Sequence, residues 1–233
     1  MTESDEILAI PLWINGHAYL TMAPAFFDVR DVRSGKVRRR TPLCGAAEAL
    51  AAVESARNAL AAWAALTAEA RATLLAALAD ALAGYAEHFA GLIAEETGKD
   101  AVAAAAEVSA ALQVLRTATA STVATGGGVV AVVSDDRAPL LGPLQQAAPA
   151  LLAGATMVLK PSPKAPSAAF ALAELTARSG FPGGVFNILQ GDLAAIEGLC
   201  AAEEVSLLLF AGDPALGSKV AAIAGRHGKP FLG

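Results

Sequence analysis

The residues best suited to chemistry in this sequence are two cysteines and three histidines, and none lies in a pattern that catalysis or metal binding requires. Cys44 and Cys200 lack Cys-x-x-Cys or Cys/His spacing, so neither a disulfide framework nor a zinc site is indicated. Cys200 lies near the end of a predicted helix without a nearby base, which favours a buried structural cysteine. His17, His88 and His227 fall on a turn, a helix and a helix end, where surface or packing roles outweigh catalysis. We therefore predict no catalytic residue and no metal ligand.

The second half of the chain predicts the sheet that would position a ligand site. Short β-branched runs alternate with helices and are typical of buried parallel strands: 129–133, 156–159, 185–189 and 205–210. This alternation predicts an α/β fold with a Rossmann-like open parallel sheet of four or five strands and flanking helices. Such sheets bind ligands beyond the carboxyl ends of their strands, so the loops after these runs form the candidate site. None of them contains G-x-G-x-x-G or a P-loop motif, so a standard dinucleotide or P-loop site is not indicated.

A small N-terminal β segment and a helical block precede this sheet. Asn15-Gly16 and Ser34-Gly35 predict two strand pairings. Apolar residues at helical spacing follow, with Thr67 as an N-cap and Gly98 as a helix stop. We expect a single domain over residues 1–233, made of N-terminal strands at 1–40, a helical block at 46–118, a connector at 119–128 and the sheet at 129–233.

Several separated motifs, in order along the chain, resemble the nucleotide-binding domain of the aldehyde dehydrogenases. The first half contains Trp13-Ile14-Asn15-Gly16, Phe27-Asp28-Val29, Ser34-Gly35-Lys36-Val37, Ala61-Ala62-Trp63 and Glu95-Glu96-Thr97-Gly98-Lys99. The second half contains Pro149-Ala150-Leu151-Leu152-Ala153-Gly154, Leu159-Lys160-Pro161-Ser162, Gly183, Val185-Phe186-Asn187 and Gly191-Asp192. The resemblance is closest to the non-catalytic second copy of two-domain aldehyde dehydrogenases, because the turn at 136–141 is similar to one there. It implies the N-terminal, NAD-binding part of that fold.

The resemblance also implies a set of catalytic parts, which this sequence lacks. In the family a cysteine attacks the aldehyde, an asparagine and a backbone amide hold the oxyanion, hydride passes to NAD(P), and a glutamate activates water. Arg137 stands at the asparagine position. The glutamate position falls at or after Gly233, and we expect the domain that carries the nucleophilic cysteine to be absent. The chain is therefore expected to be inactive alone.

Parts of the family's cofactor site survive. Lys160 matches the lysine that contacts the adenosine ribose, and the resemblance adds four further cofactor-binding candidates: Ser162, Gly191, Gly212 and Gly217. Pro163 replaces the acidic residue that shares the ribose. Asp213 stands where the pyrophosphate turn has a hydroxyl, and a carboxylate there favours a helix cap over a phosphate site. We expect either no cofactor or weak NAD(P) binding.

Composition limits the partners. The net charge of -5 argues against nucleic acid, which requires many cationic side chains. Arg38-Arg39-Arg40 is interpreted as a solvated strand edge. The acidic start Met1 to Asp5 and the absence of about 20 uninterrupted apolar residues indicate a cytoplasmic protein without a membrane span.

Three functions stay open on the sequence. The first is a scaffold or regulatory subunit that binds a full-length aldehyde dehydrogenase or a second copy of itself. The second is a module that binds NAD(P), favoured by Lys160 and opposed by Asp213 and Pro163. The third is an oxidoreductase that becomes active only with a partner supplying the cysteine domain.

Overall fold

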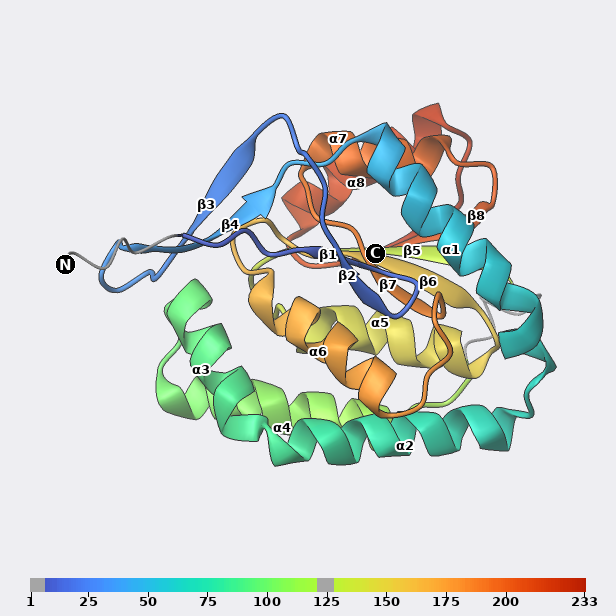
Figure 1. Cartoon of the computed structure of the whole chain (residues 1–233), viewed down its shortest axis with the longest axis horizontal. Helices are drawn as coiled ribbons and strands as arrows, with labels where there is room; N and C mark the ends of the chain where they lie inside the picture. The colour runs from blue at the N-terminus through green and yellow to red at the C-terminus, as the bar shows by residue number, and fades with distance from the viewer. Residues whose placement is uncertain (1–6, 121–127) are drawn as a thin grey trace.

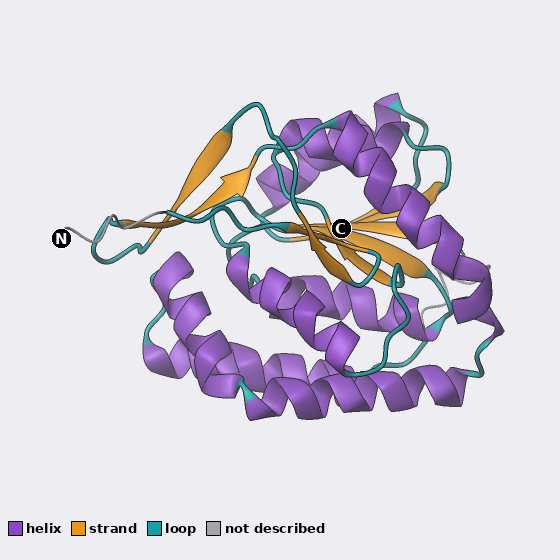
Figure 2. Cartoon of the chain, in the orientation of Figure 1, coloured by secondary structure: helices purple, strands orange, loops and turns teal. Residues whose placement is uncertain are grey.

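A twisted sheet runs through the centre of the molecule, with helices on both faces (Figure 1 and Figure 2). The computed structural model describes residues 7–120 and 128–233, and within them seven strands form this sheet in the order β2-β1-β7-β6-β5-β8-β9. Their bounds are β1 Leu12–Ile14, β2 His17–Tyr19, β5 Val129–Ser134, β6 Thr156–Lys160, β7 Phe186–Ile188, β8 Val205–Ala211 and β9 Phe231–Leu232. The strands from β5 to β9 are parallel to one another, whereas β1 and β2 are antiparallel additions at one edge. The predicted α/β class, with its open parallel sheet, is confirmed.

The helical segments divide between the two faces of the sheet. In chain order they are α1 Ala46–Ala65, α2 Ala68–Gly84, α3 Ala86–Thr97, α4 Ala101–Thr117, α5 Leu141–Leu152, α6 Ser167–Arg178, α7 Leu193–Ala201 and α8 Pro214–Arg226. Alternate residues of β5 point into two separate hydrophobic cores, as a strand covered on both faces requires: Val130 and Val132 into one, Val129 and Val133 into the other. One core contains α1, α7 and α8, and the other contains α5 and α6 with α2 and α4 outside them (Figure 1).

The N-terminal strands are more closely joined to the sheet than the sequence predicted. The turn at Asn15-Gly16 forms the expected hairpin of β1 and β2, with Asn15 and Gly16 both at positive φ. However, Trp13 of β1 pairs antiparallel with Ile188 of β7, which extends the predicted sheet of four or five strands to seven. The second predicted pairing, β3 Phe26–Arg30 with β4 Val37–Pro42, forms a separate two-stranded sheet.

Local signals set several helix ends as expected. Thr67 caps α2 by accepting a hydrogen bond from the amide of Ala70, and Gly98 ends α3 in the left-handed conformation. Gly154 and Gly180 follow α5 and α6 with positive φ.

Most of the predicted connector lies in 121–127, outside the described residues. In the parts that the structure describes, no helix is long and apolar enough to cross a bilayer.

Candidate functional site

The candidate site lies where the strand order reverses. β6 and β7 lie on one side of β5, whereas β8 and β9 lie on the other, and the two loops that follow β5 and β8 lead to helices on opposite faces of the sheet. This is the switch point at which open α/β sheets carry their ligand crevice. These loops carry Asp135, Arg137 and Asp213. In an open α/β sheet this crevice is the position at which a ligand is expected.

Three charged side chains connect these two loops to each other. The buried carboxylate of Asp135 accepts hydrogen bonds from the amide of Arg137 at 2.9 Å and from the amide of Asp213 at 2.7 Å. The guanidinium of Arg137 pairs with the carboxylate of Asp213, and its Nε lies 3.8 Å from Asp135. Arg137 and Asp213, which the resemblance placed at the oxyanion and pyrophosphate positions, are therefore ion-pair partners of each other.

The two glycines of the predicted pyrophosphate turn are explained by close packing. Gly212 has a φ of +156°, and a Cβ placed on it would lie 2.4 Å from the carboxyl carbon of Asp135. A Cβ on Gly217 would lie 3.1 Å from the ring of Phe210. Gly212 is thus required by the packing and backbone conformation of this chain alone, and the contact at Gly217 would be tight for any larger residue.

Acidic side chains occupy the helix starts that follow β5, β6, β7 and β8. Asp213 caps α8 by accepting hydrogen bonds from the amides of Ala215 and Leu216, as the sequence predicted. Asp192 caps α7 in the same way. Glu107, from α4, accepts from the first amides of α5, and Glu96, from α3, accepts from the first amide of α6. Free amides and a positive dipole make a helix start attractive to phosphate, so these carboxylates compete with any anion for the same positions.

Lys160 and Gly191, two of the predicted cofactor residues, are brought together at the ends of β6 and β7. Lys160 is buried, and its Nζ donates to the carbonyl of Gly191 at 3.0 Å. Burial lowers the pKa of Lys160 from 10.5 to about 8, with Asp192 acting in the opposite direction. Ser162 is also buried, and its hydroxyl accepts from the amide of Lys164 in the following turn. Lys160 is thus held within the protein, while Gly212 and Gly217 lie at the start of α8.

Both cysteines are buried, which confirms the prediction for Cys200. Burial raises the pKa of the Cys44 thiol to about 12 and that of the Cys200 thiol to about 11, so both are poor nucleophiles at neutral pH. Across residues 7–120 and 128–233, His, Cys, Asp and Glu side chains form no group of three or more that could hold a metal ion.

Sequence reasoning missed Asp135, Glu96 and Glu107, which organise this edge of the sheet. Glu107 interrupts the Ala-rich face of its helix, and an isolated acid on a face that is otherwise apolar was the available signal. Asp135 lies among several polar residues after β5, so no local pattern distinguished it.

Comparison with known sequences identifies the family. A profile described as the aldehyde dehydrogenase family matches residues 21–232, which is most of the chain. The chain belongs to the aldehyde dehydrogenase family. Among curated aldehyde dehydrogenases, it is 33% identical over 213 residues to the NADP(+) succinate-semialdehyde dehydrogenase of Escherichia coli (strain K12), covering 83% of this chain and 44% of that protein. It is 27% identical to the human mitochondrial acylating methylmalonate-semialdehyde/malonate-semialdehyde dehydrogenase, covering 97% of this chain and 46% of that protein.

Solved aldehyde dehydrogenase structures share the fold. An NADP-dependent enzyme of E. coli superposes with a TM-score of 0.86 at 30% identity, over 96% of this chain and 50% of that one. The lactaldehyde dehydrogenase of Escherichia coli superposes with a TM-score of 0.87 at 26% identity, over 97% of this chain and 51% of that one. The chain thus spans about half the length of the relatives that it matches.

Proposed function

We propose that this chain is a non-catalytic aldehyde dehydrogenase relative that acts as a scaffold or regulatory subunit of a full-length aldehyde dehydrogenase. The observation that carries the proposal is the pairing of Arg137 with Asp213 across the switch-point crevice. Each residue replaces a group that the family's chemistry uses, and together they neutralise each other's charge. A function based on protein contacts is compatible with this site, whereas oxyanion and pyrophosphate binding are not.

Electrostatics supports this choice. A pyrophosphate at the start of α8 would approach the carboxylate of Asp213, and such a contact costs a few kcal/mol at short range in a partly screened site. It would also have to displace the hydrogen bonds that Asp213 makes to the first amides of the helix. Removing an oxyanion donor typically lowers a rate by roughly a hundred- to a thousandfold, and Arg137 presents no amide to replace it.

NAD(P) binding is the second candidate, because one observation favours it. Lys160 keeps the family's lysine position and lies against Gly191, a second predicted cofactor residue. A cofactor would bind at this part of the site if its ribose contacted Lys160 and its pyrophosphate could lie near the carboxylate of Asp213. The proposal and this alternative differ in whether the unmodified chain binds the cofactor.

Calorimetric titration of the chain with NAD and NADP, up to millimolar concentration, tests both candidates. We expect no saturable heat, because Asp213 and Arg137 occupy the crevice. The double variant Arg137→Asn with Asp213→Ser restores the family's amide and hydroxyl, and serine remains a good N-cap. We expect saturable binding to the double variant, and its loss when Lys160→Ala is added.

Binding of the cofactor to the unmodified chain would contradict the scaffold proposal. Saturable binding to the unmodified chain, removed by Lys160→Ala, would replace the scaffold proposal with a nucleotide-binding module. Circular dichroism of each variant checks that the fold is retained.

A further inference from the structure

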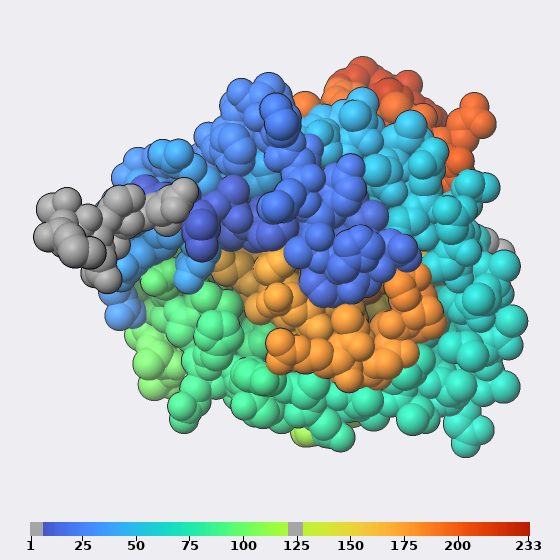
Figure 3. All heavy atoms as spheres, in the orientation of Figure 1, coloured from blue at the N-terminus to red at the C-terminus, as the bar shows by residue number. Residues whose placement is uncertain are grey.

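A pocket of about 400 Å³ lies away from the switch-point crevice, between the N-terminal segment, β4, α3 and α6. The N-terminal segment forms one wall because Ile10 donates a backbone hydrogen bond to Arg40 of β4 at 2.8 Å, and Arg40 donates one to Leu8 at 3.0 Å. Figure 3 shows the N-terminal segments, in blue, beside α6 in orange and α3 in green. The volume falls in the range of small-molecule sites.

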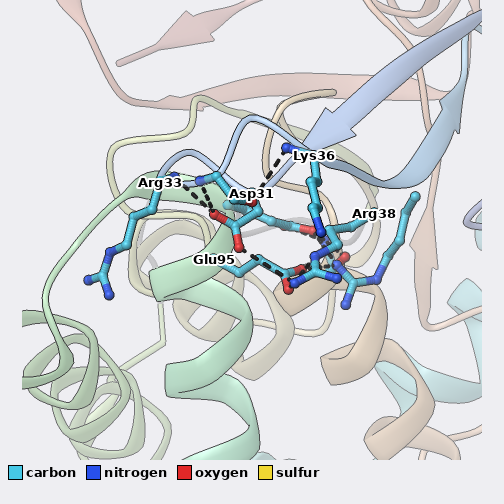
Figure 4. Close-up of polar contacts among 9 residues, drawn as sticks. Asp31, Arg33, Lys36, Arg38 and Glu95 are labelled. Carbon is cyan, nitrogen blue, oxygen red and sulfur yellow. Dashed lines mark hydrogen bonds and ion pairs between the residues drawn. The ribbon is translucent and has the colours of Figure 1, made fainter.

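One end of this pocket is lined by two arginines. Arg39 lines it, and its Nη1 contacts Glu95 at 2.6 Å and Glu96 at 3.3 Å. Among the described residues its Nε and Nη2 have no hydrogen-bond partner, so one edge of the guanidinium is unused. Arg38 lines the same pocket and pairs with Asp31 and Glu95 (Figure 4). Glu95 is thus a partner of both arginines.

The middle of the pocket is apolar. Glu96, in the last turn of α3, contacts Ser167, the first residue of α6, and from this contact the two helices run in opposite directions (Figure 1). Leu92 lies one turn back along α3, and Phe170 lies one turn forward along α6. These side chains provide a surface for a hydrocarbon chain.

The far end of the pocket is polar. His88 lies two turns from Glu96 along α3, and Glu174 lies two turns from Ser167 along α6. Both side chains line the pocket. Two helical turns are about 10 Å, which is close to the extended length of a six-carbon acid. The pocket therefore has an end with guanidinium donors, an apolar middle and a polar exit at which a chain could stop.

We propose that this pocket binds a small carboxylic acid with an apolar chain, its carboxylate on the unused edge of Arg39 and its chain against Leu92 and Phe170. A guanidinium edge with two N–H groups matches the two oxygens of a carboxylate. A phosphate dianion fits less well, because Glu95 and Glu96 lie on the other side of the same guanidinium. An amine would meet Arg39 with like charge.

Hexanoate, hexylamine and hexanol are suitable probes, since they share one chain and differ in charge. The chain has three histidines, so the ring protons of His88 give a resolved local NMR signal, assigned with His88→Gln. We expect hexanoate to move this signal saturably and hexylamine to bind about tenfold more weakly or less, as loss of a charged hydrogen bond implies.

Two variants and two matched controls localise the effect. Arg39→Gln should weaken hexanoate binding about tenfold, and Ala171→Leu should prevent it by filling the pocket. Arg116→Gln and Ala105→Leu make the same changes at exposed positions on α4 and should leave the affinity unchanged. Equal binding of hexylamine, absence of saturable hexanoate binding, or an unchanged affinity in Arg39→Gln would each overturn the proposal.

Discussion

Arg137 and Asp213 are separated by 76 positions, yet they form one ion pair in the structure. The resemblance predicted an amide at the first position and a hydroxyl at the second, and in the sequence the two charged residues look unrelated. In the structure each charge neutralises the other, because the guanidinium of Arg137 lies against the carboxylate of Asp213. This pairing is the residue-level basis for the proposed loss of cofactor and oxyanion binding.

Glu96 is the buried carboxylate whose ionisation should influence stability most directly. Burial raises the pKa of Glu96 from 4.5 to about 7, although the hydrogen bonds from Ser167 and the charge of Arg39 oppose the shift. Since the folded chain binds this proton more tightly than the unfolded chain, its stabilising contribution is complete below about pH 4.5. That contribution is lost as the pH rises to about 7.

Glu96→Gln should therefore reduce the dependence of stability on pH. The free energy of unfolding of the unmodified chain should contain a component that falls between pH 4.5 and 7 by up to about 1.4 kcal/mol per pH unit. The variant should lack this component, while Glu87→Gln, at an exposed position of the same helix, should retain it. Urea unfolding across this pH range measures the difference, and identical profiles for all three proteins would show that Glu96 does not titrate as inferred.

At the scale of elements, Arg71 connects the ends of two helices. Its side chain is buried and donates to the carbonyls of Leu66 at the end of α1 and Leu152 at the end of α5, at 2.5 and 2.8 Å. The last carbonyls of a helix lack partners within the helix, so one arginine satisfies groups at both ends. Trp63 adds a hydrogen bond from its Nε1 to Leu151.

Arg71→Met should destabilise the fold by about 3 kcal/mol, because it removes charged hydrogen bonds and leaves buried carbonyls unsatisfied. Arg116→Met is the matched control, since Arg116 is exposed and its one ion-pair partner within residues 7–120 and 128–233 is Asp80. A change under about 0.5 kcal/mol is expected. Chemical denaturation of both variants provides the comparison. Equal losses would mean that the guanidinium of Arg71 contributes little beyond its hydrocarbon stem.

At the scale of the whole molecule, the chain covers both faces of its main sheet with its own helices (Figure 2). It therefore has the buried cores of a folded unit, independent of any catalytic chemistry. A regulatory role would depend on its outer surface. Its expected partners are a full-length aldehyde dehydrogenase or a second copy of the chain.

Sedimentation velocity can distinguish these partners. The chain alone has a mass of 23.4 kDa, and self-association would appear as a species of twice that mass. We expect a mixed complex with a full-length aldehyde dehydrogenase from the same genome at micromolar concentration. The succinate-semialdehyde dehydrogenase of Escherichia coli, a relative of this chain, serves as the non-cognate control. Absence of a mixed complex with every such enzyme of that genome would exclude the regulatory-subunit proposal.

The sequence by itself determined the elements whose signals are local. The strand runs predicted at 129–133 and 205–210, the N-cap at Thr67 and the helix stop at Gly98 depend on residues within a few positions of each other. Burial of Cys200 was predicted from its place near a helix end without a nearby base. The family resemblance rested on motifs of the same short range.

Only the tertiary structure decided how distant parts meet. It placed β1 against β7, divided the helical block between two faces of the sheet, and brought Glu107 to the start of α5, 33 positions away. Hydrophobic periodicity specifies which face of an element is buried, but it carries no information about the element that covers that face. The sequence likewise does not say which distant charges will meet, because that depends on the order of the strands in the sheet. Arg137 and Asp213 therefore look independent in the sequence but form one ion pair in the structure.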